Sequence, residues 1–199
     1  EIGWDGRDGT WMVKRERQAL ESLARAGIEV PLVYAKFKID SHYYLVMEQV
    51  EGETLQTFLE KRQRRLSIRR VLEFARQISS LLARIHRAGW LWLDCKPANL
   101  ILTRNGKLRP LDFEGACSVK RSVAPDWQTP AFKSPGSISG KSLSPSEDMY
   151  ALGVTFYFLL TGRLPEGSKR KSMYGRDVPK QLRRVIENLL SPDPQVRPG

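Results

Sequence analysis

The clearest pattern of hydrophobic and polar positions lies between residues 67 and 88, and it predicts a long amphipathic helix. Its apolar residues recur every three or four positions, which places them on one face of an α-helix; they are Val71, Phe74, Ile78, Leu81, Leu82 and Ile85. Ser67 is typical of an N-cap, and Gly89 is typical of the position just past a helix end. The pattern therefore predicts a helix that packs one face against a core.

The pattern in the first third of the chain predicts a mixture of helices and strands. Residues 11–26 have apolar positions at helical spacing, and a second, shorter helix is expected to begin within residues 54–63. Between them, residues 31–38 and 43–50 are rich in Val, Tyr and Phe and predict two strands.

Composition limits the class of protein. The chain has 199 residues, of which 41% are hydrophobic, enough for one globular domain or two small lobes. The longest apolar run, residues 151–160, contains a glycine and a threonine and is much shorter than the ~20 residues of a membrane span. No signal peptide is evident, and Cys95 and Cys117 have no metal-ligand or disulfide pattern. We therefore expect a cytoplasmic protein without a membrane span.

The formal net charge is +11, and basic runs occur at residues 61–65, 69–70 and 169–171. Such runs are most often solvated surfaces, although an acidic peptide, an anionic membrane or a nucleic acid could bind them. No nucleic-acid-binding motif accompanies them, so we expect no nucleic-acid partner.

Residues 89–114 contain the side chains that suit catalysis. Asp94, Lys96 and Asn99 form the frame D-x-K-P-x-N. An apolar run, an Asn-Gly turn, a second apolar run and Asp112-Phe113-Glu114 follow. Asn-Gly between two apolar runs is typical of a β-hairpin. The hairpin is expected to fold the chain back and to bring Asn99 beside Asp112.

These groups suit phosphoryl transfer. Asn99 and Asp112 supply the hard oxygen ligands that Mg²⁺ requires. Lys96 can neutralise charge on a transferred phosphoryl group, and Asp94 can accept a hydroxyl proton or orient the hydroxyl for in-line attack. The alternative is a polar loop beside an unrelated hairpin.

In this order, the two motifs resemble the catalytic loop and the metal-binding triplet of eukaryotic-like protein kinases. Residues 146–154 (SEDMYALGV) resemble the start of the large buried kinase helix, and residues 159–165 and 178–198 resemble the segments that follow it. The resemblance implies an α+β, protein-kinase-like fold of two lobes, with a truncated N-lobe and a mostly helical C-lobe. It also implies Asp94 and Lys96 as catalytic residues, with ATP and Mg²⁺ as cofactors.

The resemblance also suggests a nucleotide site. The second predicted strand resembles the last strand of the small lobe and the hinge that follows it. Met47 would then lie at the back of the nucleotide pocket, and Glu48 and Val50 would offer backbone groups to adenine. Ile101 corresponds to the residue under the adenine ring; core packing of the hairpin would also explain it.

Two further residues would support the site. Glu16 resembles the helix glutamate that pairs with a strand lysine, and it could equally be a charged residue on a helix surface. Asp148 would accept backbone N–H groups of the catalytic loop, and it also suits the N-terminus of a helix.

The chain departs from the kinase pattern at three places. Trp92-Leu93 stands where the family has His-Arg, which makes control by a phosphorylated activation loop doubtful. Glu114 replaces the glycine of D-F-G and so disfavours the usual loop switch. Gly136 replaces a glutamate that would pair with Arg197, and Glu147 is a candidate substitute.

Neither a Gly-rich loop nor a V-A-I-K-type lysine precedes Glu16. Residues 1–50 are therefore predicted to form a partial N-lobe, and residues 51–199 a C-lobe without its final helix. We expect a fragment of a longer protein that would bind ATP poorly by itself.

The predicted function is ATP- and Mg²⁺-dependent phosphorylation of Ser or Thr in a protein or peptide. The stretches W-D-G-R-D-G, Y-Y-L-V-M-E-Q-V-E-G and D-F-E resemble the kinase-like domain of class III and IV lanthipeptide synthetases, and a free-standing bacterial Ser/Thr kinase fits about as well. An aminoglycoside-type small-molecule phosphotransferase and a pseudokinase that acts as a binding module are the alternatives. Lys96 and the helix of Asp148 argue against the first, and the intact catalytic and metal positions argue against the second.

Overall fold

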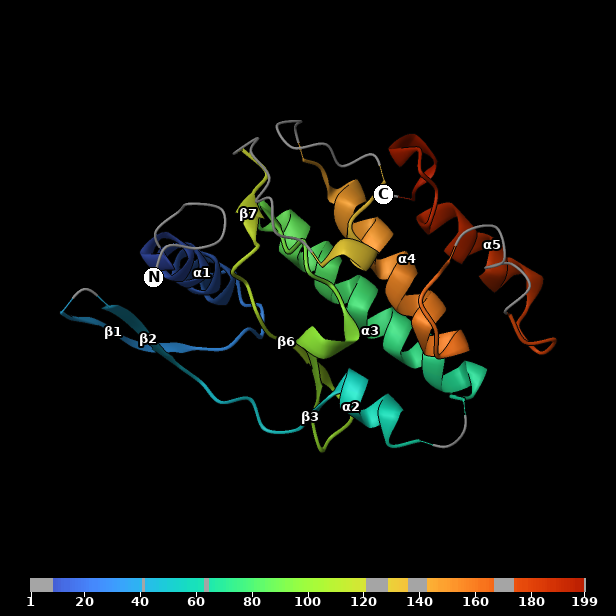
Figure 1. Cartoon of the computed structure of the whole chain (residues 1–199), viewed down its shortest axis with the longest axis horizontal. Helices are drawn as coiled ribbons and strands as arrows, with labels where there is room; N and C mark the ends of the chain where they lie inside the picture. Colours follow the sequence, from blue (N-terminus) through green and yellow to red (C-terminus); the bar gives the residue numbers. More distant parts are fainter. Residues whose placement is uncertain are drawn as a thin grey trace.

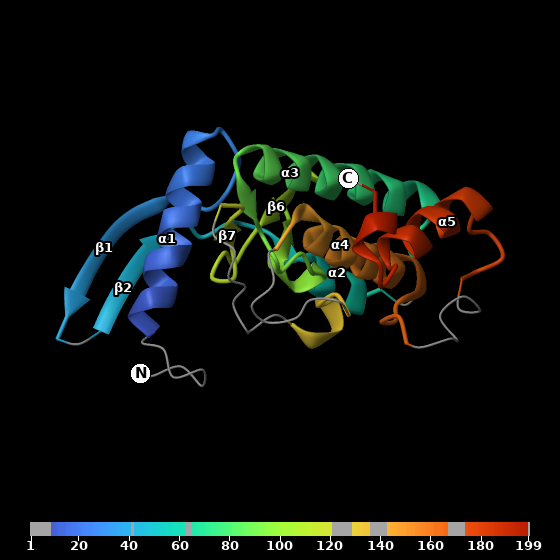
Figure 2. The same ribbon diagram turned by 90° about the horizontal axis from the view of Figure 1, so that it is seen from above.

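The computed structural model describes residues 9–40, 42–62, 65–120, 129–135, 143–166 and 174–198. Within these residues the chain forms two lobes of unequal size, a small one with a helix and a two-stranded sheet and a larger, mostly helical one (Figures 1 and 2). The predicted α+β class, with a small sheet-containing lobe and a mostly helical larger one, is confirmed. No helix in the described part is both long and apolar enough to cross a membrane.

The small lobe consists of helix α1 (Gly9–Arg25) and the antiparallel strands β1 (Val33–Ile39) and β2 (His42–Met47). Exposure alternates along β2, with Tyr43, Leu45 and Met47 half-buried and their neighbours exposed. On the exposed face the rings of Phe37 and Tyr44 stack with their centroids 5.2 Å apart. The second predicted strand therefore ends at Met47, and residues 48–50 leave the sheet.

The larger lobe is built around α3 (Ile68–Arg87), α4 (Pro145–Thr161) and α5 (Lys180–Leu189), with the short α2 (Leu55–Glu60) below them (Figure 1). Helix α3 begins and ends as predicted, since the Ser67 hydroxyl accepts a hydrogen bond from the N–H of Arg70 and Gly89 adopts φ +78°. Its apolar stripe faces the core.

From Ala151 on, helix α4 is apolar on nearly all sides and is buried except at Phe158, as expected for the central helix of a domain. Gly153 lets it approach α5 closely, because a Cβ at this position would lie 2.7 Å from the Cβ of Leu189. The Thr155 hydroxyl donates a hydrogen bond to the carbonyl of Cys95 at 2.8 Å. The same helix thus supports both α5 and the loop that carries the candidate catalytic residues.

Two small sheets connect these elements. In the first, β3 (Glu53–Thr54), β5 (Leu100–Leu102) and β6 (Leu108–Pro110) lie in the order β3-β5-β6. In the second, β4 (Trp90–Leu91) pairs with β7 (Cys117–Ser118). Short 3₁₀ turns occur at η1 (Pro97–Asn99), η2 (Pro130–Phe132) and η4 (Pro194–Val196). Strands β5 and β6 form the predicted hairpin. Its turn is longer than two residues, and within it the N–H of Gly106 donates a hydrogen bond to the carbonyl of Thr103.

Helix α1 packs directly against the larger lobe. Ala19, Leu20 and Leu23 are at most 1% exposed and belong to the same core cluster as the large-lobe residues. The Trp90 indole N–H donates to the Ser22 hydroxyl at 3.0 Å. This packing fixes α1 beside the strands that lead into the candidate site.

Candidate active site

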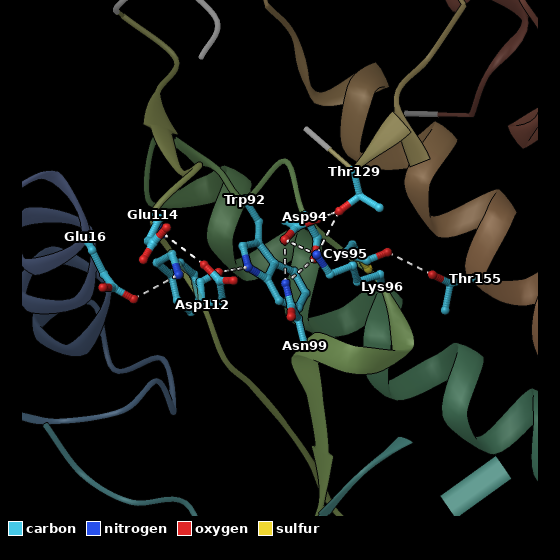
Figure 3. A network of polar contacts seen from close by, with 11 residues as sticks. Glu16, Trp92, Asp94, Cys95, Lys96, Asn99, Asp112, Glu114, Thr129 and Thr155 are labelled. Carbon is cyan, nitrogen blue, oxygen red and sulfur yellow. Dashed lines mark hydrogen bonds and ion pairs between the residues drawn. The ribbon is translucent and has the colours of Figure 1, made fainter. Parts of the chain in front are cut away.

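Three polar side chains surround the Asp94 carboxylate, those of Lys96 and Asn99 from the loop after β4 and that of Thr129 from the start of η2 (Figure 3). Its Oδ2 accepts hydrogen bonds from Lys96 Nζ at 2.7 Å and from Asn99 Nδ2 at 2.6 Å. Its Oδ1 accepts one from the Thr129 hydroxyl at 3.0 Å, and that hydroxyl in turn accepts one from Lys96 Nζ at 2.7 Å. The closed ring of contacts fixes the direction of the carboxylate.

Asp148, near the start of α4, holds the backbone of this loop. Its fully buried carboxylate accepts hydrogen bonds from the N–H of Trp92 at 3.0 Å and of Leu93 at 2.7 Å. It also lies 2.7 Å from Nε2 of His86. Leu93 adopts φ +66°, a left-handed conformation that costs a residue with a side chain ~1–2 kcal/mol. The contacts with Asp148 offset that cost and keep the loop in shape.

The β5–β6 hairpin brings Asn99 and Asp112 together, as predicted. The N–H of Leu111 donates to the carbonyl of Asn99 at 2.8 Å, so the next residue, Asp112, lies beside it. Asp112 has φ +58°, and its carbonyl accepts a hydrogen bond from the Trp92 indole N–H at 2.9 Å. The two candidate metal ligands therefore have fixed backbones.

Negative charge accumulates beside these ligands. Desolvation, followed by the nearby Asp94 carboxylate, raises the pKa of Asp112, and the hydrogen bond from the Glu114 N–H and the Lys96 ammonium only partly offset this. Desolvation and the charges of Asp112 and Asp94 also raise the pKa of Glu114. A cation bound at Asp112 would relieve the repulsion between the carboxylates.

The donor groups fit Mg²⁺. Asn99 uses its amide nitrogen toward Asp94, which leaves its amide oxygen for a cation, and Asp112 adds a carboxylate. In the described part of the chain, no three His, Cys, Asp or Glu side chains converge as a metal site. Phosphate oxygens and water would complete the coordination, as is usual for Mg²⁺.

Helix α1 contributes the Glu16 carboxylate to the other side of the site (Figure 3). It accepts a hydrogen bond from the N–H of Phe113 at 3.3 Å. Desolvation is the main cause that raises the pKa of Glu16 to about 7, and the carboxylates of Glu114 and Asp112 add to it. The ring of Phe113 stacks on that of Trp92 with centroids 5.6 Å apart. Pairing of Glu16 with a strand lysine stays a prediction.

The four residues expected at the nucleotide lie where the two lobes meet. Met47 ends β2 and is half-buried, and Glu48 and Val50 follow it outside any strand. Ile101 lies in β5, is 6% exposed, and pairs across the sheet with Thr54. Their contacts with adenine stay a prediction.

Sequence reasoning assigned no role to three residues that the structure brings into the site. Thr129 bonds to Asp94, and its position in a Thr-Pro pair was the available indication. The Arg15 guanidinium donates to the carbonyls of Ala116 at 2.5 Å and Gly115 at 3.3 Å, yet in R-E-R it resembles a surface charge. Arg109 is a charged residue between the apolar Leu108 and Pro110 of β6, so it was the easiest of the three to notice in the sequence.

Arg197 pairs with Glu147, the substitute partner that the sequence suggested. It is 6% exposed, donates to the carbonyl of Ser146 at 2.9 Å, and forms an ion pair with Glu147 at 3.9 Å. Gly136, the position of the expected glutamate, lies outside the described residues.

Comparison with known proteins agrees with this geometry. The family model of the protein kinase domain matches residues 7–199. The chain is 29% identical over 219 residues to the probable serine/threonine-protein kinase SCO3848 of Streptomyces coelicolor, an alignment that covers 96% of the chain and 32% of that protein. It is 34% identical over 172 residues to serine/threonine-protein kinase PknA of Mycobacterium tuberculosis, covering 77% of the chain and 39% of PknA.

An animal protein is similar to the same extent. The hormonally up-regulated neu tumor-associated kinase homolog B of Xenopus laevis is 28% identical over 179 residues, or 80% of the chain and 28% of that protein. The chain thus spans about a third of the length of these curated relatives. Because the family model covers nearly all of it, the chain belongs to the protein kinase domain family.

Proposed function

We propose that this chain forms the catalytic core of a protein serine/threonine kinase, which transfers the γ-phosphate of ATP to Ser or Thr hydroxyls of a protein or peptide. The observation that carries the proposal is the Asp94 carboxylate, oriented by Lys96, Asn99 and Thr129, with Asp112 beside Asn99. The relatives named as serine/threonine-protein kinases support the choice of hydroxyl.

Each side chain has a role that follows from its position. Asp94 orients the substrate hydroxyl and accepts its proton. Lys96, which already bridges Asp94 and Thr129, balances the negative charge that builds up on the phosphoryl oxygens. Asn99 and Asp112 would hold Mg²⁺, which neutralises phosphate charge when it is bound.

The remaining positions complete the proposed site. Met47, Glu48, Val50 and Ile101 would form the adenine pocket at the junction of the lobes. Glu16 and Asp148 support the site from α1 and α4. We expect the protein to work in the cytoplasm, without nucleic acid as a partner.

The test uses the natural protein with Mg·ATP and candidate substrates, and mass spectrometry maps the phosphate. Phosphoserine or phosphothreonine that disappears in Asp94→Asn supports the proposal. The substrates include a lanthipeptide precursor, whose selective phosphorylation would assign the chain to peptide biosynthesis. Phosphate transferred only to small alcohols would indicate a small-molecule phosphotransferase, and absence of nucleotide binding would indicate a pseudokinase.

A further inference from the structure

A salt bridge that the kinase motifs do not include joins β6 to the first residue after β2, beside the expected adenine pocket. Arg109 lies on β6, directly across the sheet from Ile101, and cross-strand partners project from the same face. Both terminal nitrogens of its guanidinium donate to the Glu48 carboxylate, Nη2 to Oε2 at 2.9 Å and Nη1 to Oε1. This two-point contact fixes the direction of Glu48 as well as its distance.

The same pair also binds the segment between α1 and β1. Arg109 Nη2 donates to the carbonyl of Val30 at 3.1 Å. The carboxylate of Glu48 accepts from the N–H of Leu32 at 3.2 Å, and the N–H of Glu48 donates to the carbonyl of Leu32 at 2.8 Å. Arg109 and Glu48 thus connect three segments, namely β6, the linker after α1, and the first residue after β2.

The electrostatics agree with a specific contact. The side chains of Arg109 and Glu48 are only 19% and 21% exposed. The hydrogen bond with Arg109 is the main cause that lowers the pKa of Glu48, and the same bond is the main cause that raises the pKa of Arg109. Nε of Arg109 is buried with no hydrogen-bond partner among the described atoms. Such an arrangement contributes little net stability, and partly buried ion pairs are better suited to fixing one geometry.

The segment that these contacts control has few other restraints. Residues 48–50 belong to no strand or helix. After them, Gly52 has φ +142°, and its Cα lies against Leu102 and Ile101 so closely that a Cβ would be 2.5 Å from the carbonyl oxygen of Leu102. The stretch between Met47 and Gly52 is thus held at both ends, and Glu48 is the restraint at its start.

We propose that Arg109 is a positioning residue for nucleotide binding, which acts through Glu48 to hold residues 48–50 in the conformation that receives adenine. The inference rests on the proposed function, because that function places adenine against Glu48 and Val50. Without the arginine, the segment samples other conformations, and the apparent affinity falls by the fraction that remains competent.

The test is Arg109→Gln in the natural protein. We expect the affinity for Mg·ADP, measured by calorimetry, to fall about five- to tenfold, because residues 48–50 would then adopt the conformation that binds adenine only part of the time. KM for ATP should rise by a similar factor and kcat should change less than about twofold, because the adenine contacts are equal in the ground state and the transition state. Competition by adenosine, which has no phosphates, should weaken by the same factor as binding of Mg·ADP.

Matched variants separate positioning from a change of charge or stability. Arg70→Gln removes a surface arginine that pairs with Glu73 at 2.7 Å and should leave the affinity unchanged. Arg109→Lys keeps the charge but not the two-point contact, so it should restore only part of the affinity. In a double-mutant cycle, Glu48→Gln should lose little further affinity when Arg109 is already glutamine.

Two results would overturn the inference. One is wild-type affinity for Mg·ADP and adenosine in Arg109→Gln. The other is a fall in kcat without a change in affinity, which would place Arg109 in the chemical step. Failure of the proposed function looks different, because the wild-type protein itself would then bind no Mg·ADP or transfer no phosphate to protein.

Discussion

The buried carboxylate of Asp148 gives the most quantitative prediction. Substitution by alanine removes the acceptor of two backbone N–H groups, those of Trp92 and Leu93, and the partner of His86. The N–H groups then lie in a protein interior without a partner. The left-handed conformation of Leu93 loses its main support at the same time.

The size of the effect follows from these contacts. A hydrogen bond to a charged group contributes about 1.5–3 kcal/mol, and three such bonds in one network do not add fully. Removing the charge also removes its desolvation cost, so the net loss is close to the ~3–5 kcal/mol seen when a buried pair loses one partner. At about 2–4 °C per kcal/mol for a domain of this size, Tm should fall by about 6–20 °C.

The assay is thermal and urea unfolding of the natural protein, compared with Asp177→Ala, which removes an exposed carboxylate and should change stability by less than ~0.5 kcal/mol. At a temperature where Asp148→Ala is still folded, kcat should fall at least about tenfold, because the loop that carries Asp94 is no longer held in position. An unfolding free energy within about 1 kcal/mol of the wild type would contradict the assigned role of these hydrogen bonds.

Three further predictions concern other parts of the site. The pKa of Glu16 is raised from 4.5 to about 7, so its contribution to stability is fully present below pH 4.5 and is lost as the pH rises through 7. Wild-type unfolding free energy should therefore fall between pH 5 and 8 by up to ~2 kcal/mol more than that of Glu16→Gln, and parallel pH curves would refute this. Thr129→Val removes the hydroxyl that links Asp94 and Lys96 and should lower kcat about tenfold, whereas Thr129→Ser should retain activity; equal kcat values in a transfer assay would contradict it. Gly52→Ala places a Cβ 2.5 Å from a backbone oxygen at φ +142° and should lower the unfolding free energy, measured in urea, by at least ~2 kcal/mol. Gly27→Ala, with φ +74° and open space around it, should lower it by only ~1 kcal/mol. Similar losses in the two variants would show that the close approach at Gly52 adds nothing to the cost of the backbone conformation.

Local patterns predicted the elements well where one physical cause dominates. Helix α3 was predicted almost to the residue, because its N-cap, its apolar stripe and the glycine past its end all agree. The hairpin and the placement of Asn99 beside Asp112 followed from an Asn-Gly turn between two apolar runs. The candidate catalytic frame could be recognised because its members are close in sequence.

The contacts that cross between segments could not be predicted in this way. Glu48 follows the end of β2 at Met47, and its partner Arg109 is 61 residues away. Thr129 meets Asp94 across 35 residues, and Arg15 meets Ala116 across 101. Hydrophobic periodicity describes contacts within one helix or strand, so it carries no information about contacts between residues this far apart in the sequence.

The residues that depart from the usual kinase motif are themselves part of the support. Trp92 stands where the family has histidine, and its backbone N–H bonds to Asp148 while its indole N–H bonds to the carbonyl of Asp112. Its ring stacks on Phe113, and both rings are fully buried. One residue, Trp92, therefore links Asp148 on α4 to the candidate metal ligand Asp112. Histidine has less ring area to bury, so tryptophan adds apolar packing to the loop at this position.

The segment after Asp112 is held in a similar way from α1. Consecutive residues of that helix contact it, since Glu16 accepts the N–H of Phe113 and Arg15 donates to the carbonyl of Ala116. Helix α1 thus accepts one hydrogen bond from this segment and donates another to it, so a movement of the helix would also move the segment. Because Glu114 stands where the motif has a flexible glycine, we expect these contacts to hold Asp112, the candidate metal ligand, in one conformation.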